Sequence, residues 1–433
     1  MKRIGEFINT IKALPERKAL GKAISVSVLN QIVSSGTNFA LGIYLIRVLP
    51  PEEFGLYGIG FAICLFFVGI GNALFLTQMV VHTPDRVPED RLPYAARMFF
   101  SVAIFCALLL LIVLLIFFVG REVSTVLERY ANYGIAVSLA AATCLVKDFF
   151  VRHAYNQRRE SWALAINLIL AISMGFLFVT IYFIKLGMSD VIALWIYAIS
   201  NGIAALNGYI ITKLPLNHIN SVELKKNLQE AWDGGSFSVL AHIIITLRSQ
   251  AHTIVLAILV GPTGVAVVNA GRIMVSPVAM LFPALSQIFL PRLSEARNTK
   301  ADGGRVDGLR YSLLLAAIVT VYSMMMLAFY DVAQRLFIGS KYGDLFIIVM
   351  MWCIYTCLTA YKTGLEIFMV ASKSFKEQAM VNFIGALVSL IMVFLLASIY
   401  GVIGAIAGLS ISELVVILLM MNGNHLRKVR SRI

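Results

Sequence analysis

The sequence predicts an all-α polytopic membrane protein with about 12 transmembrane helices in two six-helix lobes around a central cavity. Two observations carry this prediction. The chain contains repeated apolar stretches of about 20 residues, the length that a helix needs to cross the hydrocarbon core of a bilayer. Its Lys and Arg residues fall almost entirely into alternate connections between those stretches. Because unpaired backbone groups are costly in lipid, we expect each stretch to be a helix.

The apolar stretches fall into two groups that are separated by a polar, mixed-charge interval. The first group is 24–46, 54–80, 94–119, 133–151, 162–184 and 190–212. The second group is 234–260, 263–290, 311–330, 345–371, 377–399 and 401–421. We therefore predict a cytoplasmic N-terminal segment (1–23), an N-lobe (24–212), a cytoplasmic linker (213–233), a C-lobe (234–421) and a basic cytoplasmic tail (422–433).

The charge bias predicts the orientation, because short loops rich in Lys and Arg stay in the cytoplasm. Both ends of the chain lie on the basic side, so both termini are predicted to be cytoplasmic. The outer side carries few cations, namely Arg47, Arg121, Arg129, Lys185, Arg335 and Lys341. The same bias accounts for the net charge of +13, and we expect no nucleic-acid binding.

Polar residues gather on one face of the first predicted span. Asn30, Gln31, Ser34 and Asn38 recur at helical spacing, while apolar residues fill the opposite face. Such a face does not look toward lipid. It either makes hydrogen bonds to neighbouring helices or lines a cavity, and the spacing is equally compatible with both.

Charged residues enter the second group of spans. Arg248 and Arg272 lie in spans seven and eight, and Lys362 and Glu366 lie one helical turn apart in span ten. Glu413 follows in span twelve. Glu366 and Glu413 could neutralise two of the cations internally. Three fixed cations nevertheless face only two carboxylates, and an excess of buried positive charge is costly unless an anion binds there.

We therefore predict a cationic substrate site at Arg248, Arg272 and Lys362. Guanidinium groups stay charged when desolvated and grip phosphate oxygens in a bidentate fork, so phosphate is the natural anion. His252, on the same side of span seven as Arg248, is predicted to line the cavity. It is either a proton carrier or a structural hydrogen-bond donor.

Several kinds of chemistry lack the residues that they need. The five cysteines all lie in apolar segments without metal-ligand spacing, so we predict no metal site and no disulfide framework. The sequence contains no phosphate-binding G-x-x-x-x-G-K-[ST] loop, no H-E-x-x-H pair and no serine-triad pattern. These absences indicate a non-enzyme.

One motif links the chain to a known family. Residues 47–57, RVLPPEEFGLY, resemble the R-x-L-G-P-E-x-F-G-x-Y signature that follows the first span of bacterial polysaccharide transporters. These transporters belong to the multidrug, oligosaccharidyl-lipid and polysaccharide flippase superfamily. Residues 291–294 resemble the P-x-L-S that closes span eight in that family. Pro50 departs from the signature, which usually has Gly at that place.

The resemblance implies a flippase in the bacterial cytoplasmic (inner) membrane. Its substrate would be an undecaprenyl-pyrophosphate-linked oligosaccharide, an O-antigen (lipopolysaccharide), capsule or exopolysaccharide repeat unit, moved by alternating access. Its partners would be that lipid-linked oligosaccharide, membrane lipids, and the polysaccharide polymerase and glycosyltransferases of the same pathway. No cofactor is expected. Proton or sodium coupling would involve Glu366 or Glu413, which could equally serve only to balance charge.

A multidrug or metabolite exporter of the same superfamily is the alternative. A site for cationic drugs would need buried carboxylates, whereas the second lobe carries surplus Arg and Lys. The sign of the charge therefore favours the polysaccharide transporter.

Overall fold

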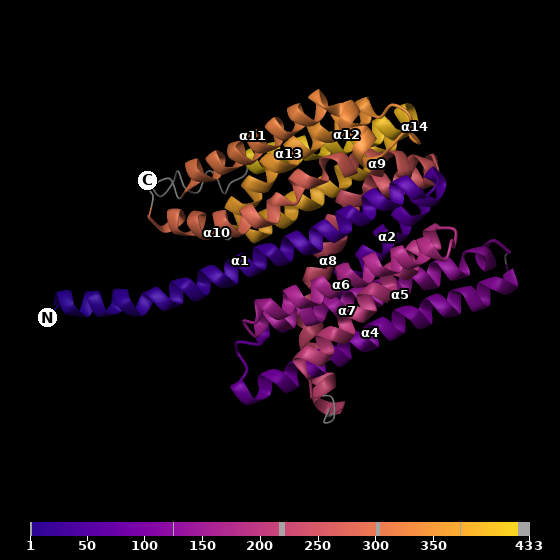
Figure 1. Ribbon diagram of the computed structural model, residues 1–433. Coiled ribbons are helices and arrows are strands. Elements are labelled where there is room, and N and C mark those ends of the chain that lie inside the picture. The colour runs from indigo at the N-terminus through magenta and orange to yellow at the C-terminus, as the bar shows by residue number, and fades with distance from the viewer. Residues whose placement is uncertain (1, 124, 216–220, 300–303, 373, 423–433) are drawn as a thin grey trace. The chain divides into compact units, whose positions relative to one another are not determined.

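The computed structural model describes residues 2–123, 125–215, 221–299, 304–372 and 374–422. All regular structure within these ranges is helical, with no strand (Figure 1). The predicted basic tail beyond residue 422 and residues 216–220 of the predicted linker lie outside the described residues.

The helices follow one another with short connections. The first part of the chain contains α1 (Lys2–Val48), α2 (Pro51–Gly71), the π-helix η1 (Asn72–Leu76), α3 (Thr77–His82), α4 (Pro88–Val123), α5 (Thr125–Asn156), α6 (Glu160–Phe183) and α7 (Asp190–Thr212). The second part contains α8 (Ser221–Leu259), α9 (Pro262–Ala279), α10 (Leu281–Thr299), α11 (Arg305–Ala328), α12 (Tyr330–Phe337), α13 (Phe346–Ala371) and α14 (Phe375–Asn422).

Ten helical segments among the described residues are long and apolar enough to cross a membrane. One of them runs through α2, η1 and α3, and another covers nearly all of α14. The predicted first span, 24–46, lies within α1. The predicted all-α membrane fold is confirmed, while the count of about twelve spans stays a prediction with which these helices agree.

α14 is two helices joined by a sharp turn. Gly401 at the turn has φ 57° and ψ −132°, a conformation in which a side chain would be strained. The hydroxyl of Ser412 donates a hydrogen bond of 2.9 Å to the carbonyl of Gly385. In a straight helix these residues would lie roughly 40 Å apart. The chain therefore folds back at Gly401, and the two predicted spans 377–399 and 401–421 pack side by side.

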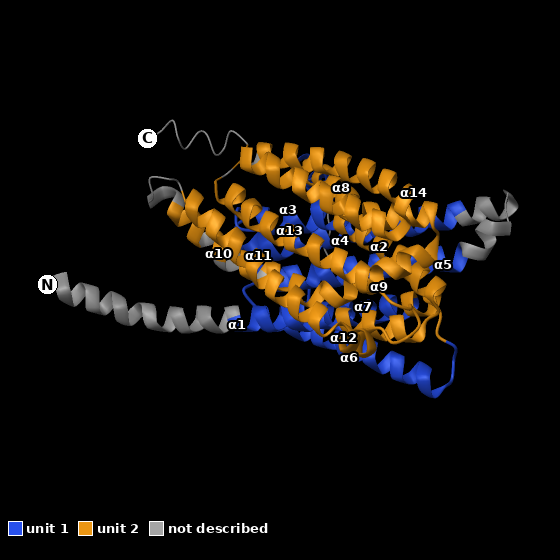
Figure 2. Ribbon diagram, turned by 90° about the horizontal axis from the view of Figure 1, so that it is seen from above, with its two compact units in different colours: residues 1–38, 71–187, 195–236 blue, residues 39–70, 188–194, 237–433 orange. Residues whose placement is uncertain are grey.

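Two compact units make up the chain (Figure 2). Unit 1 comprises residues 1–38, 71–187 and 195–236, and unit 2 comprises residues 39–70, 188–194 and 237–433. The helices α1 and α8 each contribute to both units. The predicted boundaries of the two lobes and of the linker stay predictions.

Each unit has its own packed interior. In unit 1, α5 packs against α4 and α6, and the rings of Phe99, Phe149 and Phe150 lie 5.4 Å apart in each pair. In unit 2, α13 packs against α9, α10, α11 and α14. A buried cluster joins four of these helices: Val278, Phe289, Leu293, Leu315, Val319, Ala360, Ile367, Phe368 and Ala371. One side of α13 is therefore buried among these helices, and Lys362 lies on that side.

Candidate functional site

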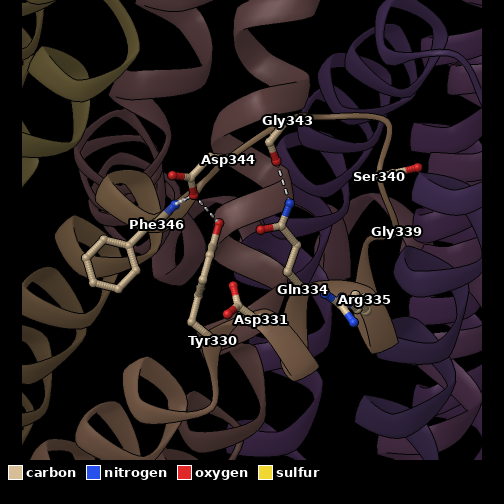
Figure 3. A pocket seen from close by; sticks show the side chains of 9 residues that line it. All are labelled: Tyr330, Asp331, Gln334, Arg335, Gly339, Ser340, Gly343, Asp344 and Phe346. Atoms are coloured by element: carbon tan, nitrogen blue, oxygen red, sulfur yellow. Dashed lines mark hydrogen bonds between the residues drawn. The ribbon is translucent and has the colours of Figure 1, made fainter.

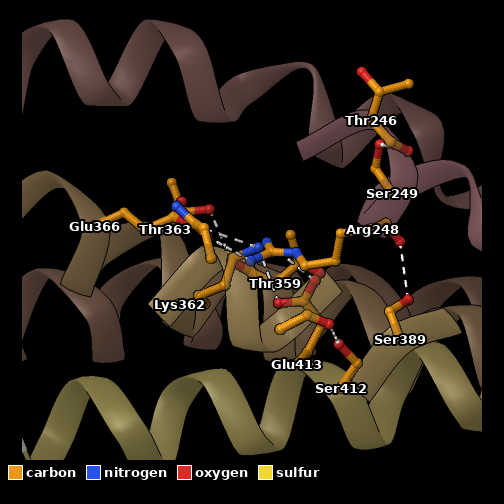
Figure 4. A network of polar contacts seen from close by, with 12 residues as sticks. Thr246, Arg248, Ser249, Thr359, Lys362, Thr363, Glu366, Ser389, Ser412 and Glu413 are labelled. Carbon is orange, nitrogen blue, oxygen red and sulfur yellow. Dashed lines mark hydrogen bonds and ion pairs between the residues drawn. The ribbon is translucent and has the colours of Figure 1, made fainter. Parts of the chain in front are cut away.

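Four charged side chains meet inside unit 2 (Figure 4). We call Arg248 of α8, Lys362 and Glu366 of α13, and Glu413 of α14 the charge cluster. The Glu413 carboxylate lies 3.4 Å from the Arg248 guanidinium and 2.9 Å from the Lys362 ammonium. Lys362 lies 3.9 Å from Glu366, one helical turn further along α13. Glu413 thus bridges two of the three predicted cations.

Both halves of α14 hold this cluster in place. Asn382, in the first half, accepts a hydrogen bond of 2.6 Å from the Arg248 guanidinium. The hydroxyl of Ser389 donates to the backbone carbonyl of Arg248 at 3.0 Å. Glu413 comes from the second half. The turn at Gly401 is therefore what brings a carboxylate and its supporting polar groups to the same point on α8.

The charge cluster is electrically balanced, and three of its four residues are buried. Arg248, Lys362 and Glu413 are only 7%, 5% and 3% exposed. Burying an unpaired charge is far costlier than burying a hydrogen-bonded pair. The cluster contains two cations and two carboxylates, so Glu366 and Glu413 neutralise Arg248 and Lys362, which is one of the two alternatives left open by the sequence. A contact of Arg248 or Lys362 with substrate stays a prediction.

Arg272 is different from the other two cations. Its side chain is exposed, and it has no carboxylate partner in the described part of the chain. The guanidinium carbon lies 5.9 Å from the centre of the Trp352 ring, within the range of a cation–π contact. Among the three predicted cations, Arg272 is thus the one whose charge no carboxylate of the described residues neutralises.

Trp352 fixes the surroundings of Arg272. Its indole N–H donates a hydrogen bond of 3.0 Å to the carbonyl of Val268 in α9. The His252 ring packs edge-on against it at 5.5 Å, and His252 is 1% exposed. His252 therefore lies behind Trp352, in the packed interior. Nothing in the sequence singles out Trp352 or Asn382, because neither residue belongs to a charged or periodic pattern.

The polar residues on one face of α1 differ in their surroundings: one bonds to other helices, and others are exposed. The Asn30 amide donates to the Tyr155 hydroxyl at 2.9 Å and accepts from Asn167 at 2.8 Å, so it ties α1 to α5 and α6. Gln31 donates to Ser35 within α1. Ser34 is half-buried and Asn38 is exposed. Asn30 thus makes interhelical hydrogen bonds, whereas Gln31 and Asn38 have exposed side chains.

An open pocket of about 750 Å³ lies at the α12–α13 connection, on the predicted outer side (Figure 3). The Asp344 carboxylate accepts hydrogen bonds from the backbone N–H of Phe346 at 2.9 Å and from the Tyr330 hydroxyl at 2.8 Å. These two bonds lower the pKa of Asp344. The side-chain amide of Gln334 donates to the carbonyl of Gly343. The pocket wall is therefore held by its own hydrogen bonds.

Ion pairs of unit 1 join α4 and the connection before it to α8. The buried Arg97 pairs with Asp90 at 2.7 Å and with Glu223 at 2.8 Å. Arg86 pairs with Glu230. These pairs fix the first turns of α8 against α4. Arg86 and Arg97 therefore have carboxylate partners in unit 1.

The described residues contain no group of three or more His, Cys, Asp or Glu side chains that could hold a metal ion. The five cysteines, which all lie in the described ranges, form no disulfide bond with one another.

Comparison with known proteins gives a consistent picture. The sequence profile of the family described as polysaccharide biosynthesis protein matches residues 20–297. A proposed O-antigen transporter of Escherichia coli (strain K12) is 23% identical over 404 residues, covering 91% of this chain and 95% of its own length.

Two solved structures share the fold. An inward-facing multidrug resistance MATE family transporter of the MOP superfamily matches with a TM-score of 0.75 at 14% identity, covering 94% of this chain and 99% of its own. The lipid II flippase MurJ in an inward closed conformation matches with a TM-score of 0.67 at 14% identity, covering 92% and 86%.

Proposed function

Because this chain belongs to the family of polysaccharide biosynthesis proteins, we propose that it is a flippase for a lipid-linked oligosaccharide. The chain is a multi-pass membrane transporter and not an enzyme. The proposed substrate is an undecaprenyl-pyrophosphate-linked repeat unit of O-antigen, capsule or exopolysaccharide. It would move from the cytoplasmic to the outer leaflet of the bacterial inner membrane, with both termini of the chain in the cytoplasm.

The observation that carries this proposal is the unneutralised charge of Arg272. Arg248 and Lys362 share the carboxylate of Glu413, whereas Arg272 is exposed and lies over an aromatic ring. A guanidinium in that position can bind two oxygens of a phosphate at once. A pyrophosphate-linked lipid supplies such an anion, and a cationic drug does not.

The charge cluster would act in a second step. Its ion pairs leave no net charge for an anion to bind, so Arg248 and Lys362 could reach the substrate only if Glu413 were protonated or moved away. Glu366 is the more exposed carboxylate of the cluster, since a quarter of its side chain is accessible. If transport is coupled to protons or sodium, Glu366 and Glu413 are the proposed groups. Polymerase and glycosyltransferases of the same pathway are the proposed partner enzymes.

The test is the sidedness of undecaprenyl-linked oligosaccharide in cells that contain the protein and in cells depleted of it. We expect the oligosaccharide to build up on the cytoplasmic face after depletion. Complementation by the wild-type chain should reverse the build-up, and complementation by Arg272→Ala should not. Lys185→Ala, which removes another exposed cation, is the matched control and should complement fully.

An unchanged distribution would contradict the proposal. It would favour a multidrug or metabolite exporter, the alternative to which the fold of the MATE family transporter points. In that case depletion should alter drug susceptibility instead.

A further inference from the structure

Three of the few cations predicted on the outer side, Arg47, Arg335 and Lys341, lie in two segments of unit 2 that contact each other. Lys and Arg are scarce in the outer loops because the positive-inside rule concentrates them in the cytoplasmic ones. A structural contact can explain why three of the few outer cations lie close together. Arg47 lies in the last turn of α1, and Lys341 lies just beyond α12.

Two helix ends cap each other there. The Arg47 guanidinium donates to the backbone carbonyl of Arg335 at 2.9 Å and to that of Leu336. In return, the Lys341 ammonium donates to the carbonyls of Val48 at 3.1 Å and Leu49 at 3.3 Å. The last carbonyls of a helix have no intrahelical partner and carry the negative end of its dipole. Each cation therefore stabilises the end of the other segment's helix.

Hydrogen bonds between the residues that line the pocket described above fix the conformation of the loop that carries Lys341 (Figure 3). Gln334 donates to the carbonyl of Gly343, and Asp344 accepts from Tyr330 and Phe346. These bonds close the loop on α12. Lys341 therefore contacts the end of α1 from a loop whose conformation is fixed by hydrogen bonds.

The rest of the signature segment packs on the same side. The ring of Phe54 lies edge-on to that of Tyr342 at 6.4 Å. A Cβ placed on Gly55 would lie 1.8 Å from the carbonyl oxygen of Pro262, at the start of α9. Only glycine allows this approach. The signature residues 47–55 therefore contact both α9 and the α12–α13 connection.

We propose that residues 47–55 and 335–342 form an outer latch, which holds the outer ends of α1 and α2 against α9, α12 and the loop before α13. The latch would be closed when the cavity is open to the cytoplasm and broken when it opens outward. This inference rests on the alternating access of the proposed function. It assigns a role to the family signature: Arg47 caps a helix end, and Gly55 permits contact.

The contacts are of a kind that can open and close. Arg47 and Lys341 are exposed, and contacts between exposed charged groups are individually weak because water competes for them. Several such contacts together bias an equilibrium without fixing it. Breaking the latch should therefore shift the population toward the outward-open state and leave the chain folded.

A cysteine in place of Gly42 would report this shift. A Cβ at that position lies in ordinary contact with Ile273, 3.5 Å away, so the thiol would fit between α1 and α9. The probe is a membrane-impermeant maleimide added to the outside of spheroplasts. With Gly42→Cys alone we expect slow labelling. Adding Arg47→Ala and Lys341→Ala should raise the labelling rate by about threefold to tenfold.

Lys185→Ala on the Gly42→Cys background removes an outer cation that is not in the latch, and it should leave the labelling rate unchanged. Equal labelling with and without Arg47 and Lys341, at equal protein level, would overturn the latch. A second test locks the latch in its closed form. A short bifunctional thiol reagent would cross-link the two cysteines of the double variant Arg47→Cys, Leu336→Cys, and this cross-link should stop transport. Full transport after cross-linking would also overturn it.

The labelling needs no substrate, so the latch and the proposed substrate can fail separately. Raised labelling together with an unchanged sidedness of undecaprenyl-linked oligosaccharide would keep the latch and reject the substrate. Unchanged labelling together with build-up of the oligosaccharide on the cytoplasmic face would reject the latch and keep the substrate.

Discussion

Individual charged residues divide into two roles in unit 2. Arg248 and Lys362 are buried with carboxylate partners, whereas Arg272 is exposed and has no carboxylate partner in the ranges that the structure describes. The sequence could predict which spans carry these charges. It left open whether Glu366 and Glu413 neutralise two of the cations, because Glu413 reaches Arg248 and Lys362 only through the turn at Gly401. Asn382 and Trp352 were missed for the same reason: their importance comes from contacts, not from spacing.

The two arginines should therefore respond differently to substitution. Arg272→Ala should abolish export of surface polysaccharide at normal protein level, and Arg272→Lys should retain part of it, since an ammonium lacks the bidentate fork. Arg248→Ala should instead destabilise the protein by about 3–5 kcal/mol, because it removes one partner of a buried pair. Thermal unfolding in detergent, measured beside export, separates the two. Equal stability of both alanine variants would contradict the division.

Glu413 should be the most sensitive member of the charge cluster. Glu413→Gln leaves Arg248 and Lys362 facing each other with one carboxylate fewer, and we expect a loss of about 3–5 kcal/mol of stability. Adding Lys362→Met restores the balance of charge and should recover part of that loss, by about 0.5–3 kcal/mol of coupling. Thermal unfolding of the two single variants and the double variant measures this coupling. Strictly additive losses would argue against a shared network.

Asp344 gives the outer loop a pH dependence with a defined sign. Its pKa is lowered by hydrogen bonds from Phe346 and Tyr330, so its contribution to loop order is complete above about pH 4. It is lost as the pH falls through the lowered pKa of the folded chain. We expect hydrogen exchange in 338–345 to accelerate below that range, relative to the intrinsic rate. Asp344→Asn should abolish the change, and Asp331→Asn, in the same pocket, should preserve it.

Helices were predictable from the sequence where an apolar stretch is long enough to span a bilayer. The predicted span 133–151 lies within α5, and the predicted spans 162–184 and 345–371 match α6 and α13 to within about two residues at each end. Irregular features were not predictable, because they depend on neighbours. The π-helix η1 inside the second predicted span has no sequence signature, and the amphipathic α12 is too short to register as a span. α12 nevertheless carries part of the outer latch.

The close approach of α2 to α9 can be tested at the element scale. Gly55→Val places a branched side chain where the carbonyl of Pro262 already lies within 1.8 Å of a Cβ, so the two helices must separate at their outer ends. We expect faster maleimide labelling at Gly42→Cys, as in the variant that lacks Arg47 and Lys341. Gly175→Val is the control, since a Cβ there meets no atom within 4 Å. Unaltered labelling with Gly55→Val would show that this contact does not hold the latch.

At the scale of the whole molecule, charge bias and the signature segment predicted the membrane fold and the family. Both are confirmed, by the ten candidate spans and by the family match over residues 20–297. The sugar that is carried leaves no pattern in the sequence, because recognition by scattered polar side chains has no fixed spacing. The charge of Arg272 is the feature on which the proposal of an anionic substrate rests.

The most direct test of this account is reconstitution of the purified chain in liposomes with an undecaprenyl-pyrophosphate-linked oligosaccharide in the membrane. The measurement is the rate at which oligosaccharide from the inner leaflet becomes accessible to an impermeant reagent outside. We predict rapid exposure with the wild-type chain and with Lys185→Ala, and a rate close to that of empty liposomes with Arg272→Ala. Exposure by Arg272→Ala at the wild-type rate, or none by the wild-type chain, would contradict the account.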